Sequence, residues 1–399
     1  MNIVIFLLYL TSVLLIWQFI GYPLFMAIIT LKSKKKDKDY DYKPFVSIIV
    51  PTYNEEKNIK DRLQNLLELD YPKEKYEVIF VESGSTDKTY SVLDSAIKEY
   101  TDIYPKIKLI KEDKRRGKAS AIILGKKDSK ADIILVTDSN SIFEKNVLKE
   151  MMPYFKDEKV GAVGGRYMIL NPENRLTSAE SFYWDMEYIM RKGESLLDSA
   201  CLFHGEINAW RKELVKIDDS IVSEDLDTVI QIRKSGYKIE YEPEAIVYEK
   251  AATTPADQIK QRKRNTIGTI KCIFKHWKYF LFPKDLYSLF IFPSHKTLTI
   301  ISPFLLLFIL ILYLISRNIK IITINFITTI TLFLLLLSIL IFLKSKIIKD
   351  INIQKNFASF ILSIPKIVYY VLLNEYLLLL AWRDFVLKRY SVLWEKIES

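Results

Sequence analysis

Charged side chains are distributed unevenly along the 399 residues of the chain. Residues 1–31 carry none, and two further uncharged stretches cover residues 297–316 and 321–343. A helix needs about 20 apolar residues to cross a bilayer core that is about 30 Å thick, and all three stretches meet that length. Buried helices of soluble domains rarely run so far without a charge, so we interpret the three stretches as membrane-spanning helices.

The stretch at residues 1–31 is better interpreted as an anchor than as a cleaved signal peptide. No basic residue precedes it, it is longer than the apolar core of a signal peptide, and no small-residue cleavage site is evident. Lysines follow it instead, at Lys32 and residues 34–36. Because basic residues favour the cytoplasmic side, we expect the polar middle of the chain to be a cytoplasmic domain of a multi-pass protein of the cell membrane.

Two segments allow more than one interpretation. Residues 273–293 interleave aromatic side chains with lysines, which is typical of a helix in the bilayer interface, but a helix packed on the soluble domain can have the same composition. Residues 356–382 form either one kinked span or a re-entrant hairpin, so the side of the membrane on which the tail lies stays open. That stretch is interrupted by Pro365, Lys366, Asn374 and Glu375. The expected parts are an anchor (1–31), a soluble domain (43–272), an interfacial segment (273–293), a membrane region (297–382) and a tail (383–399).

Within residues 43–272, short β-branched runs alternate with amphipathic stretches, a pattern that predicts a mostly parallel, Rossmann-like α/β sheet flanked by helices. The expected strands are residues 46–50, 76–81, 107–110, 133–136 and 160–164. Candidate helix starts are Asn54, Ser85 or Thr86, Lys118, a capping box formed by Ser141 and Glu144, Leu176, and Ser223.

The composition narrows the classes of partner. A net charge of +10 suits a protein that is held at an anionic membrane surface. No basic patch with interleaved aromatic residues matches a nucleic-acid-binding module, so we expect no nucleic-acid partner. The two cysteines, Cys201 and Cys272, cannot form a disulfide framework, and three histidines argue against a zinc site built from several of them.

Polar and acidic clusters follow three of the expected strands, at residues 51–55, 82–87 and 137–140. Ligands bind at the carboxyl ends of the strands in open parallel sheets. Glu82 and Asp138 each come directly after an apolar run, where a carboxylate contributes little to packing. A single such cluster is better explained by an acidic first turn of a helix, but three in one sheet favour a ligand site.

The ordered motifs resemble those of the family 2 glycosyltransferases, which have the GT-A fold. They are Pro-Thr-Tyr-Asn-Glu-Glu from position 51, Glu-Ser-Gly-Ser-Thr-Asp from 82, Gly-Lys-Ala from 117, Asp-Ser-Asn from 138 and Ser-Glu-Asp from 223. The resemblance covers residues 43–275. The membrane layout is similar to that of the branch that contains cellulose, chitin and hyaluronan synthases and their non-processive relatives.

The resemblance implies that several residues bind the donor, a nucleotide sugar. Tyr53 would lie against the base, and Glu82 stands where the family usually has Asp, beside the base or ribose. Lys118 would lie near the base or diphosphate, although a lysine next to the basic run 114–116 is also typical of a solvated loop. The donor-binding residues expected on this basis are Thr52, Tyr53, Glu55, Glu82, Lys118 and Asp138.

The same resemblance implies a metal site and a catalytic base. Asp138 and Asn140 occupy the place of the family's Asp-x-Asp motif, which holds Mg²⁺ or Mn²⁺ through oxygen ligands, with Asn140 expected to be the weaker or indirect ligand. Asp225 matches the position of the base that accepts the proton of the acceptor hydroxyl, and Glu224 is the neighbour that tunes it. Without the other motifs, an acidic first helical turn after Ser223 would explain both residues.

The acceptor motifs are incomplete. Gln261 and Arg264 match the family's Gln-x-x-Arg-Trp motif, which implies contacts with the diphosphate and the acceptor, but Asn265 replaces the Trp that provides a stacking surface for a growing glycan. A basic turn that faces the membrane is the alternative interpretation of this cluster. His204 lies where processive relatives have an acceptor-binding loop.

These observations predict a metal-dependent, inverting, hexosyltransferase-like enzyme that moves a sugar from a nucleotide-diphosphate sugar, with a UDP-sugar favoured, to a lipid-linked or glycan acceptor. The missing Trp favours a non-processive enzyme. Two alternatives stay open: a processive polysaccharide synthase, and a non-catalytic membrane scaffold that binds nucleotides.

Overall fold

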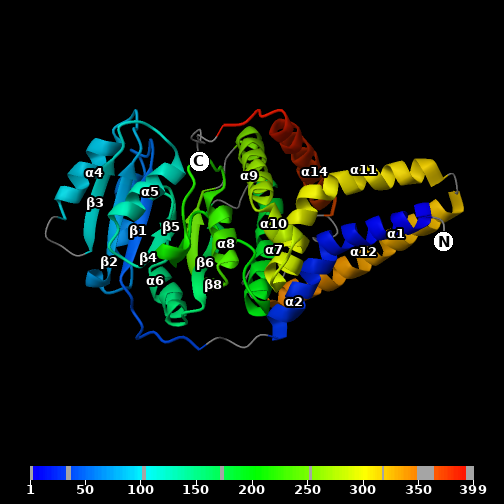
Figure 1. Cartoon of the computed structure of the whole chain (residues 1–399), viewed down its shortest axis with the longest axis horizontal. Coiled ribbons are helices and arrows are strands. Elements are labelled where there is room, and N and C mark those ends of the chain that lie inside the picture. The colour runs from blue at the N-terminus through cyan, green and yellow to red at the C-terminus, as the bar shows by residue number, and fades with distance from the viewer. Residues whose placement is uncertain are drawn as a thin grey trace.

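The computed structural model of the chain describes residues 3–32, 37–100, 105–170, 175–250, 254–316, 319–347 and 364–391. The molecule is elongated (Figure 1). A β-sheet with its covering helices lies at one end, and three long apolar helices project from the other. The protein therefore has an α/β part and a helical part.

The sheet has eight strands in the order β3-β2-β1-β4-β7-β6-β8-β5. The first four in this order are parallel to one another, β7 runs antiparallel to both β4 and β6, and β8 is parallel to β6. This mixed, mostly parallel sheet confirms the predicted fold class. The strands are β1 (Val46–Thr52), β2 (Tyr76–Glu82), β3 (Lys106–Lys111), β4 (Ile133–Val136), β5 (Ile142–Phe143), β6 (Val160–Ile169), β7 (Asn208–Arg211) and β8 (Lys238–Glu249).

Helices cover both faces of the sheet because its central strands are apolar on both sides. Along β1, Ile48 belongs to one hydrophobic core and Ile49 to the other. The helices of this part are α3 (Ile59–Leu67), α4 (Thr89–Lys98), α5 (Lys118–Asp128), α6 (Val147–Met151), α7 (Arg175–Leu197), α8 (Glu224–Lys234), α9 (Pro255–Lys275) and α10 (Trp277–Leu281), with short 3₁₀ turns η2 (Lys73–Lys75), η3 (Met152–Lys156) and η4 (Lys212–Leu214).

Two expected helix starts are wrong because the loops after β1 and β2 bind each other. The backbone N–H of Asn54 donates to Ser85 Oγ at 3.0 Å, and the N–H of Thr86 donates to Asn54 Oδ1 at 2.8 Å. Asn54 also adopts a left-handed backbone, with φ 54°. The helices consequently begin later, at Ile59 and Thr89.

The capping box predicted from Ser141 and Glu144 is also wrong. The residues between them form β5, which pairs antiparallel with β8. Pairing with a strand about 100 residues away in the sequence therefore replaces the local helix start, and α6 begins only at Val147.

Three helices are long and apolar enough to cross a membrane among the described residues: Ile3–Lys32, Tyr287–Ser316 and Ile322–Ile341. The first contains α1 (Ile3–Ile16), the π-turn η1 (Trp17–Gly21) and α2 (Tyr22–Lys32). The second contains η5 (Tyr287–Ile291), η6 (Pro293–Thr297) and α11 (Leu298–Ser316), and the third lies within α12 (Ile319–Ile347). Large apolar side chains such as Ile3 and Leu314 are more than two-thirds exposed on them.

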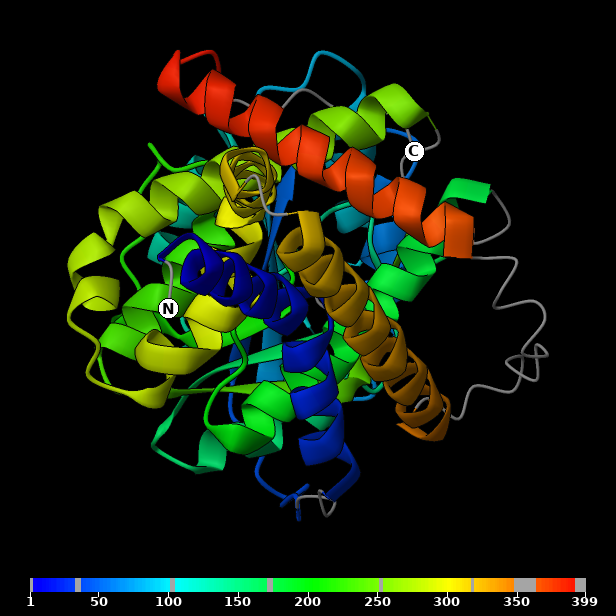
Figure 2. The ribbon, with the colours of Figure 1, turned by 90° about the vertical axis from the view of Figure 1, so that its right-hand side faces the viewer.

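Helix α14 (Ile364–Val386) contains the later part of the stretch for which we expected a kinked span or a hairpin, and residues 356–363 lie outside the described residues. Figure 2 looks along the long axis, so that α11 is seen end-on while α14 lies across the view. The helix packs on α9 and α11. Arg262 Nη1 donates to Asn374 Oδ1 at 2.8 Å, and Lys263 Nζ lies 2.6 Å from Asp384 Oδ2.

A buried polar cluster joins the helical part to the sheet part. Glu194 of α7 accepts hydrogen bonds from the Tyr22 hydroxyl at 2.7 Å and from the backbone N–H of Cys201 at 2.9 Å. Its Oε1 also lies 2.6 Å from His295 Nδ1. Glu194, Cys201 and His295 bring potential metal ligands within 4.8 Å of one another, but their bonds to each other and to Tyr22 already account for the cluster. We interpret it as a structural link between α7, α2 and η6.

Candidate active site

Lys118 is the first residue of α5, and its side chain connects three segments that are far apart in the sequence. Gly117 precedes it with φ 100°, a conformation that strains residues with a Cβ, and turns the chain from the basic loop into the helix. Lys118 Nζ lies 2.6 Å from Asp138 Oδ1 and 3.4 Å from Glu224 Oε1. The side chain is only 12% exposed, which rules out the solvated-loop interpretation of this lysine.

Carboxylates outnumber cations around Lys118. Burial and the nearby Asp138 raise the pKa of Glu206 to about 7. Burial, with the charges of Glu206 and Asp138, raises the pKa of Glu249, at the end of β8, well above its usual value. Burial also raises the pKa of Glu224. Three carboxylates, those of Asp138, Glu206 and Glu224, act electrostatically on the single ammonium group of Lys118.

The acidic groups fit a hard divalent cation, which prefers oxygen ligands. Asp138 follows β4 and Glu249 ends β8, and the charge of Asp138 acts on Glu249. Asn140 Nδ2 donates to Glu249 Oε1 at 2.6 Å. Asp138 and Glu249 could therefore hold Mg²⁺ or Mn²⁺, and Asn140 would act by orienting Glu249.

Asp225 lies in the first turn of α8, beside Lys118. Its Oδ1 accepts hydrogen bonds from Ser223 Oγ and from the backbone N–H of Leu226, both at 2.8 Å. The other oxygen, Oδ2, faces Gly205, where an added Cβ would lie 4.0 Å from it and 3.1 Å from Lys118 Nζ. A glycine at this position keeps open the space between the carboxylate and the ammonium group. Ser223 thus orients Asp225 in addition to preceding the helix.

The residues expected to bind the nucleotide divide into two groups. Tyr53 is partly exposed, and the guanidinium of Arg115 lies 3.8 Å above its ring. The other three, Thr52, Glu55 and Glu82, are buried. Glu82 Oε1 accepts a hydrogen bond from the backbone N–H of Ser85, and Glu55 Oε2 accepts one from Asn58 Nδ2. Their side chains therefore shape the loops, while Tyr53 and Arg115 offer surface to a ligand.

The basic motif on α9 contributes one residue to this site. Arg264 is close enough to Glu224 for its charge to lower the pKa of that carboxyl, against the larger effect of burial. Gln261 and Asn265 are exposed, and none of the contacts described above joins them to the carboxylates. Between them, Arg262 and Lys263 bind α14.

His204 is buried among aromatic rings. Its ring stacks on Tyr167 at 5.3 Å and lies 5.1 Å from Trp184. Burial and the nearby Arg191 hold its pKa well below its usual value, so that the imidazole is neutral. The backbone carbonyl of His204 accepts a hydrogen bond from Asn208 Nδ2 at 2.9 Å, which fixes the loop that carries Gly205 and Glu206.

Sequence reasoning did not assign Glu206, Glu249, Arg62 or Arg115 to the site. Glu249 carries the same signal as Asp138, an acidic residue at the carboxyl end of a strand. Arg62 lies on the apolar face of α3, where it donates from Nη2 to Thr137 Oγ1 at 2.5 Å and acts electrostatically on Asp138. An arginine among the apolar positions of a helix was the signal that could have revealed it.

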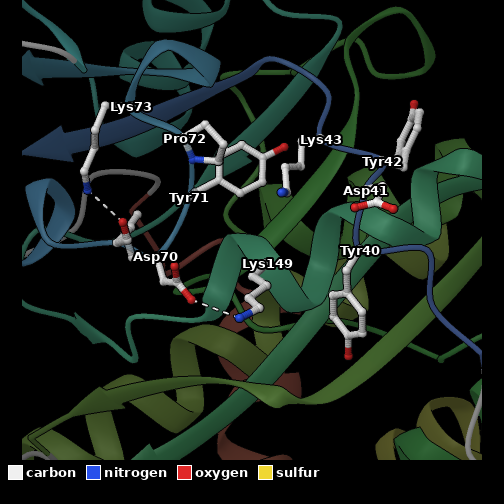
Figure 3. A pocket seen from close by; sticks show the side chains of 10 residues that line it. Tyr40, Asp41, Tyr42, Lys43, Asp70, Tyr71, Pro72, Lys73 and Lys149 are labelled. Carbon is white, nitrogen blue, oxygen red and sulfur yellow. Dashed lines mark hydrogen bonds and ion pairs between the residues drawn. The ribbon is translucent and has the colours of Figure 1, made fainter.

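A cavity of about 490 Å³ lies elsewhere, at the amino ends of β1 and β2 (Figure 3). Four of its lining side chains, those of Asp70, Tyr71, Lys73 and Lys149, already have bonding partners. Lys149 Nζ lies 3.1 Å from Asp70 Oδ2, Lys73 Nζ donates to the carbonyl of Leu69 at 2.7 Å, and the Tyr71 hydroxyl donates to the carbonyl of Pro44 at 2.7 Å. We therefore place the candidate active site at the opposite edge of the sheet, at the carboxylates around Lys118, which we call the carboxylate cluster: Asp138, Glu206, Glu224, Asp225 and Glu249.

Comparisons with known proteins agree with this geometry. The family described as Glycosyl transferase family 2 matches residues 47–217, and Glycosyl transferase family group 2 matches residues 133–344. Similar curated proteins are the probable glycosyltransferase YdaM of Bacillus subtilis (strain 168), with 28% identity over 244 residues, and the poly-beta-1,6-N-acetyl-D-glucosamine synthase of Staphylococcus aureus (strain COL), with 29% identity over 238 residues. Each match covers 58% of this chain and 57% or 56% of the relative, so the chain spans just over half the length of the curated relatives that it matches.

Among solved structures, the fold is similar to that of the mannosyltransferase PcManGT from Pyrobaculum calidifontis, which was determined in complex with GDP-Man and Mn²⁺. The TM-score is 0.65 at 23% identity, over 88% of this chain and 100% of that chain. This likeness shows a shared fold. The family matches across residues 47–344, the second of which covers more than half of the chain, establish that the chain belongs to the family 2 glycosyltransferases.

Proposed function

We propose that the protein is a membrane-bound, inverting glycosyltransferase that moves a sugar from a nucleotide-diphosphate sugar to a lipid-linked or glycan acceptor. The observation that carries this proposal is the convergence on Lys118 of Asp138, Glu224 and the Gly205 loop, with Asp225 beside them. This arrangement combines oxygen ligands for a metal, a cation for phosphate and an oriented carboxylate.

In the proposed reaction, the acceptor hydroxyl attacks the anomeric carbon from the face opposite the diphosphate. The new C–O bond forms as the bond to the diphosphate oxygen breaks, and the hydroxyl proton passes to Asp225. Its Oδ1 is held by two hydrogen bonds, so Oδ2 is the atom that can accept the proton. Lys118 and Arg264 would bind diphosphate oxygens. A divalent cation bound at Asp138 and Glu249 would neutralise the charge of the leaving diphosphate.

For the donor, we propose a UDP-sugar, with N-acetyl-D-glucosamine as the first sugar to test. The names of the Staphylococcus aureus relatives support the sugar. Tyr53, with Arg115 above its ring, is suited to stack on the base, because aromatic and guanidinium planes both stack on bases. The complex of PcManGT with GDP-Man and Mn²⁺ supports a nucleotide sugar and a metal in this fold.

We propose a multi-pass arrangement in the cell membrane with the catalytic domain in the cytoplasm. Support comes from three helices of sufficient length and apolarity and from the lysines at position 32 and at 34–36. A nucleotide sugar made in the cytoplasm would reach the site directly in this orientation.

The acceptor side supports transfer of one or a few sugars, because Asn265 is exposed and cannot supply the stacking surface of a Trp. A processive polysaccharide synthase is the second candidate, and the names of the polysaccharide-synthase relatives favour it. The length of the product, separated on a gel after a reaction with excess donor, distinguishes the two.

The central test uses the detergent-purified protein, radiolabelled UDP-N-acetylglucosamine, Mn²⁺, and either undecaprenyl phosphate or N-acetylglucosamine oligosaccharides as acceptors. We expect Asp225→Asn to abolish transfer while donor binding, measured by calorimetry, is retained, and Asp138→Ala to weaken metal-dependent donor binding. Asp219→Asn, which changes an exposed carboxylate upstream of α8, is the matched control. Undiminished product with either site variant refutes the residue assignments, and donor binding without turnover on any acceptor supports the non-catalytic scaffold.

A further inference from the structure

Four aromatic side chains form a continuous cluster beside the carboxylates, which we call the aromatic wall: Tyr167 of β6, Tyr183 and Trp184 of α7, and His204. Trp184 is central to it. Its ring centre lies 4.9 Å from that of Tyr167, 5.1 Å from that of Tyr183 and 5.1 Å from that of His204. Ring contacts at these distances make a connected aromatic surface.

The wall adjoins the proposed reaction centre. His204 is followed in the chain by Gly205 and Glu206. The carbonyl of Gly205 lies 3.4 Å from Lys118 Nζ, and Glu206 interacts electrostatically with Asp138 and Lys118. On β6, Tyr167 lies two residues before Ile169, which pairs in register with Glu249 of β8. A molecule seated on the wall would therefore lie next to both the carboxylates and the ammonium group.

The other side of the wall lies near the membrane helices. Asp185, the residue after Trp184, forms an ion pair with Lys344 of α12 at 2.6 Å. Lys344 follows directly on the apolar stretch of that helix. The wall thus stands between the carboxylate cluster and the end of a candidate membrane span, where an acceptor carried by a membrane lipid would approach.

The wall differs from a packed hydrophobic core in its exposure and in one hydrogen-bond donor that is unpaired in the described part of the chain. Tyr183 is 36% exposed and Trp184 is partly exposed. The indole Nε1 of Trp184 is buried, yet it has no hydrogen-bond partner among the described residues. Buried indole N–H groups usually find a partner, so the packing of the wall by itself does not explain this unpaired donor.

The wall is also held rigidly in place. The Tyr183 hydroxyl donates to Glu187 Oε1 at 2.6 Å, and Glu187 is bound in turn by Arg191 Nε at 3.0 Å and by His295 Nε2 at 3.2 Å. Because His204 is neutral, its ring carries no charge that would have to be desolvated by a ligand. A rigid surface loses little conformational entropy when it binds a ligand.

We propose that Trp184, supported by Tyr167 and His204, is the stacking surface for the terminal pyranose ring of the acceptor. The apolar face of a sugar ring would lie against the exposed part of the indole. This surface takes the place of the aromatic side chain that Asn265 does not provide, and it is compatible with a short or a long glycan. The inference rests on the proposed function, because it assumes a carbohydrate acceptor.

The test compares Trp184→Ala and Trp184→Phe with wild type, and Trp277→Ala, at an exposed Trp on α10, serves as the matched control. UDP release is measured with UDP-N-acetylglucosamine in Mn²⁺, with N-acetylglucosamine oligosaccharides as acceptors and with water alone. We expect Trp184→Ala to raise the oligosaccharide KM about 10-fold, the effect of one aromatic contact. The donor KM and the rate of donor hydrolysis by water should stay unchanged, and Trp184→Phe should recover most of the loss.

A binding measurement keeps the inference testable if Trp184→Ala does not fold. Tryptophan fluorescence of the wild type should change on addition of the oligosaccharide, and the change should disappear in Trp184→Phe but persist in Trp277→Phe. An oligosaccharide KM that is unchanged in Trp184→Ala overturns the inference. An equal loss of donor hydrolysis in that variant also overturns it, because such a loss indicates a structural role. If the wild type hydrolyses the donor but does not bind or use the oligosaccharide, the role of the aromatic wall is refuted and the proposed donor chemistry is not. If the wild type binds no sugar nucleotide, the proposed function and the role of the wall are both refuted.

Discussion

Replacement of Lys118 by Met is the most informative single change, because this side chain supplies the ammonium group in the carboxylate cluster. Methionine keeps most of the side-chain volume and removes the charge. Asp138 and Glu224 would then lose a partner at 2.6 Å and 3.4 Å. All three side chains are only 11–12% exposed, so water cannot fully replace the lost interaction.

The size of the effect follows from these distances. At an effective dielectric constant of about 20, Coulomb attraction is about 6 kcal/mol at the shorter distance and about 5 kcal/mol at the longer one. The cost of burying the ammonium group offsets several kcal/mol of this attraction, and removal of one partner from a buried ion pair costs about 3–5 kcal/mol. We expect a loss of about 3 kcal/mol, which lowers the Tm of a domain of this size by about 6–12 °C.

The assay is thermal unfolding in detergent at pH 7 after treatment with EDTA, with Lys114→Met as the control that removes a charge from the exposed basic loop. Addition of MnCl₂ should stabilise Lys118→Met more than wild type, because the ion no longer competes with an ammonium group for Asp138. A Tm of Lys118→Met equal to that of Lys114→Met, or a smaller response to Mn²⁺ than in wild type, would refute this account of the site.

Three further outcomes are expected. Removal of divalent metal with EDTA should leave the protein folded but abolish the thermal stabilisation by UDP-sugars, and Mn²⁺ should restore it; stabilisation that survives EDTA contradicts a metal site. Arg264→Gln should raise the donor KM about 10-fold, in line with the loss of a charge-assisted hydrogen bond, and leave the acceptor KM unchanged, as steady-state kinetics can verify. Asp227 Oδ1 lies 2.7 Å from His276 Nε2. Burial raises the pKa of Asp227, but His276 and Lys275 lower it by more, so that it lies below its usual value. The stability that Asp227 contributes is therefore present above about pH 4 and lost as the pH falls through the lowered pKa, so the Tm difference between wild type and Asp227→Asn should shrink below about pH 4.

The sequence alone determined the features that depend on neighbouring residues. The long uncharged stretches have a single favourable environment, and their positions agree with the three apolar helices. The alternation of apolar runs and amphipathic stretches predicted the strands, with β4 correct to the residue. Because parallel strands place their carboxyl ends at one edge, the sequence also predicted that Asp138 and Tyr53 follow strands at the same edge of the sheet.

Only the tertiary structure decided which side chains meet. Glu249 reaches Asn140 because β8 lies beside β5 and β6 in the sheet order, and that order cannot be deduced from local periodicity. The mutual binding of the loops that carry Asn54 and Ser85 likewise overrode two plausible helix starts. From the sequence, a solvated lysine was the weaker alternative for Lys118, and its burial depends on carboxylates contributed by distant segments. Contacts of this kind are fixed by the packing of the whole chain, because no short segment holds both partners.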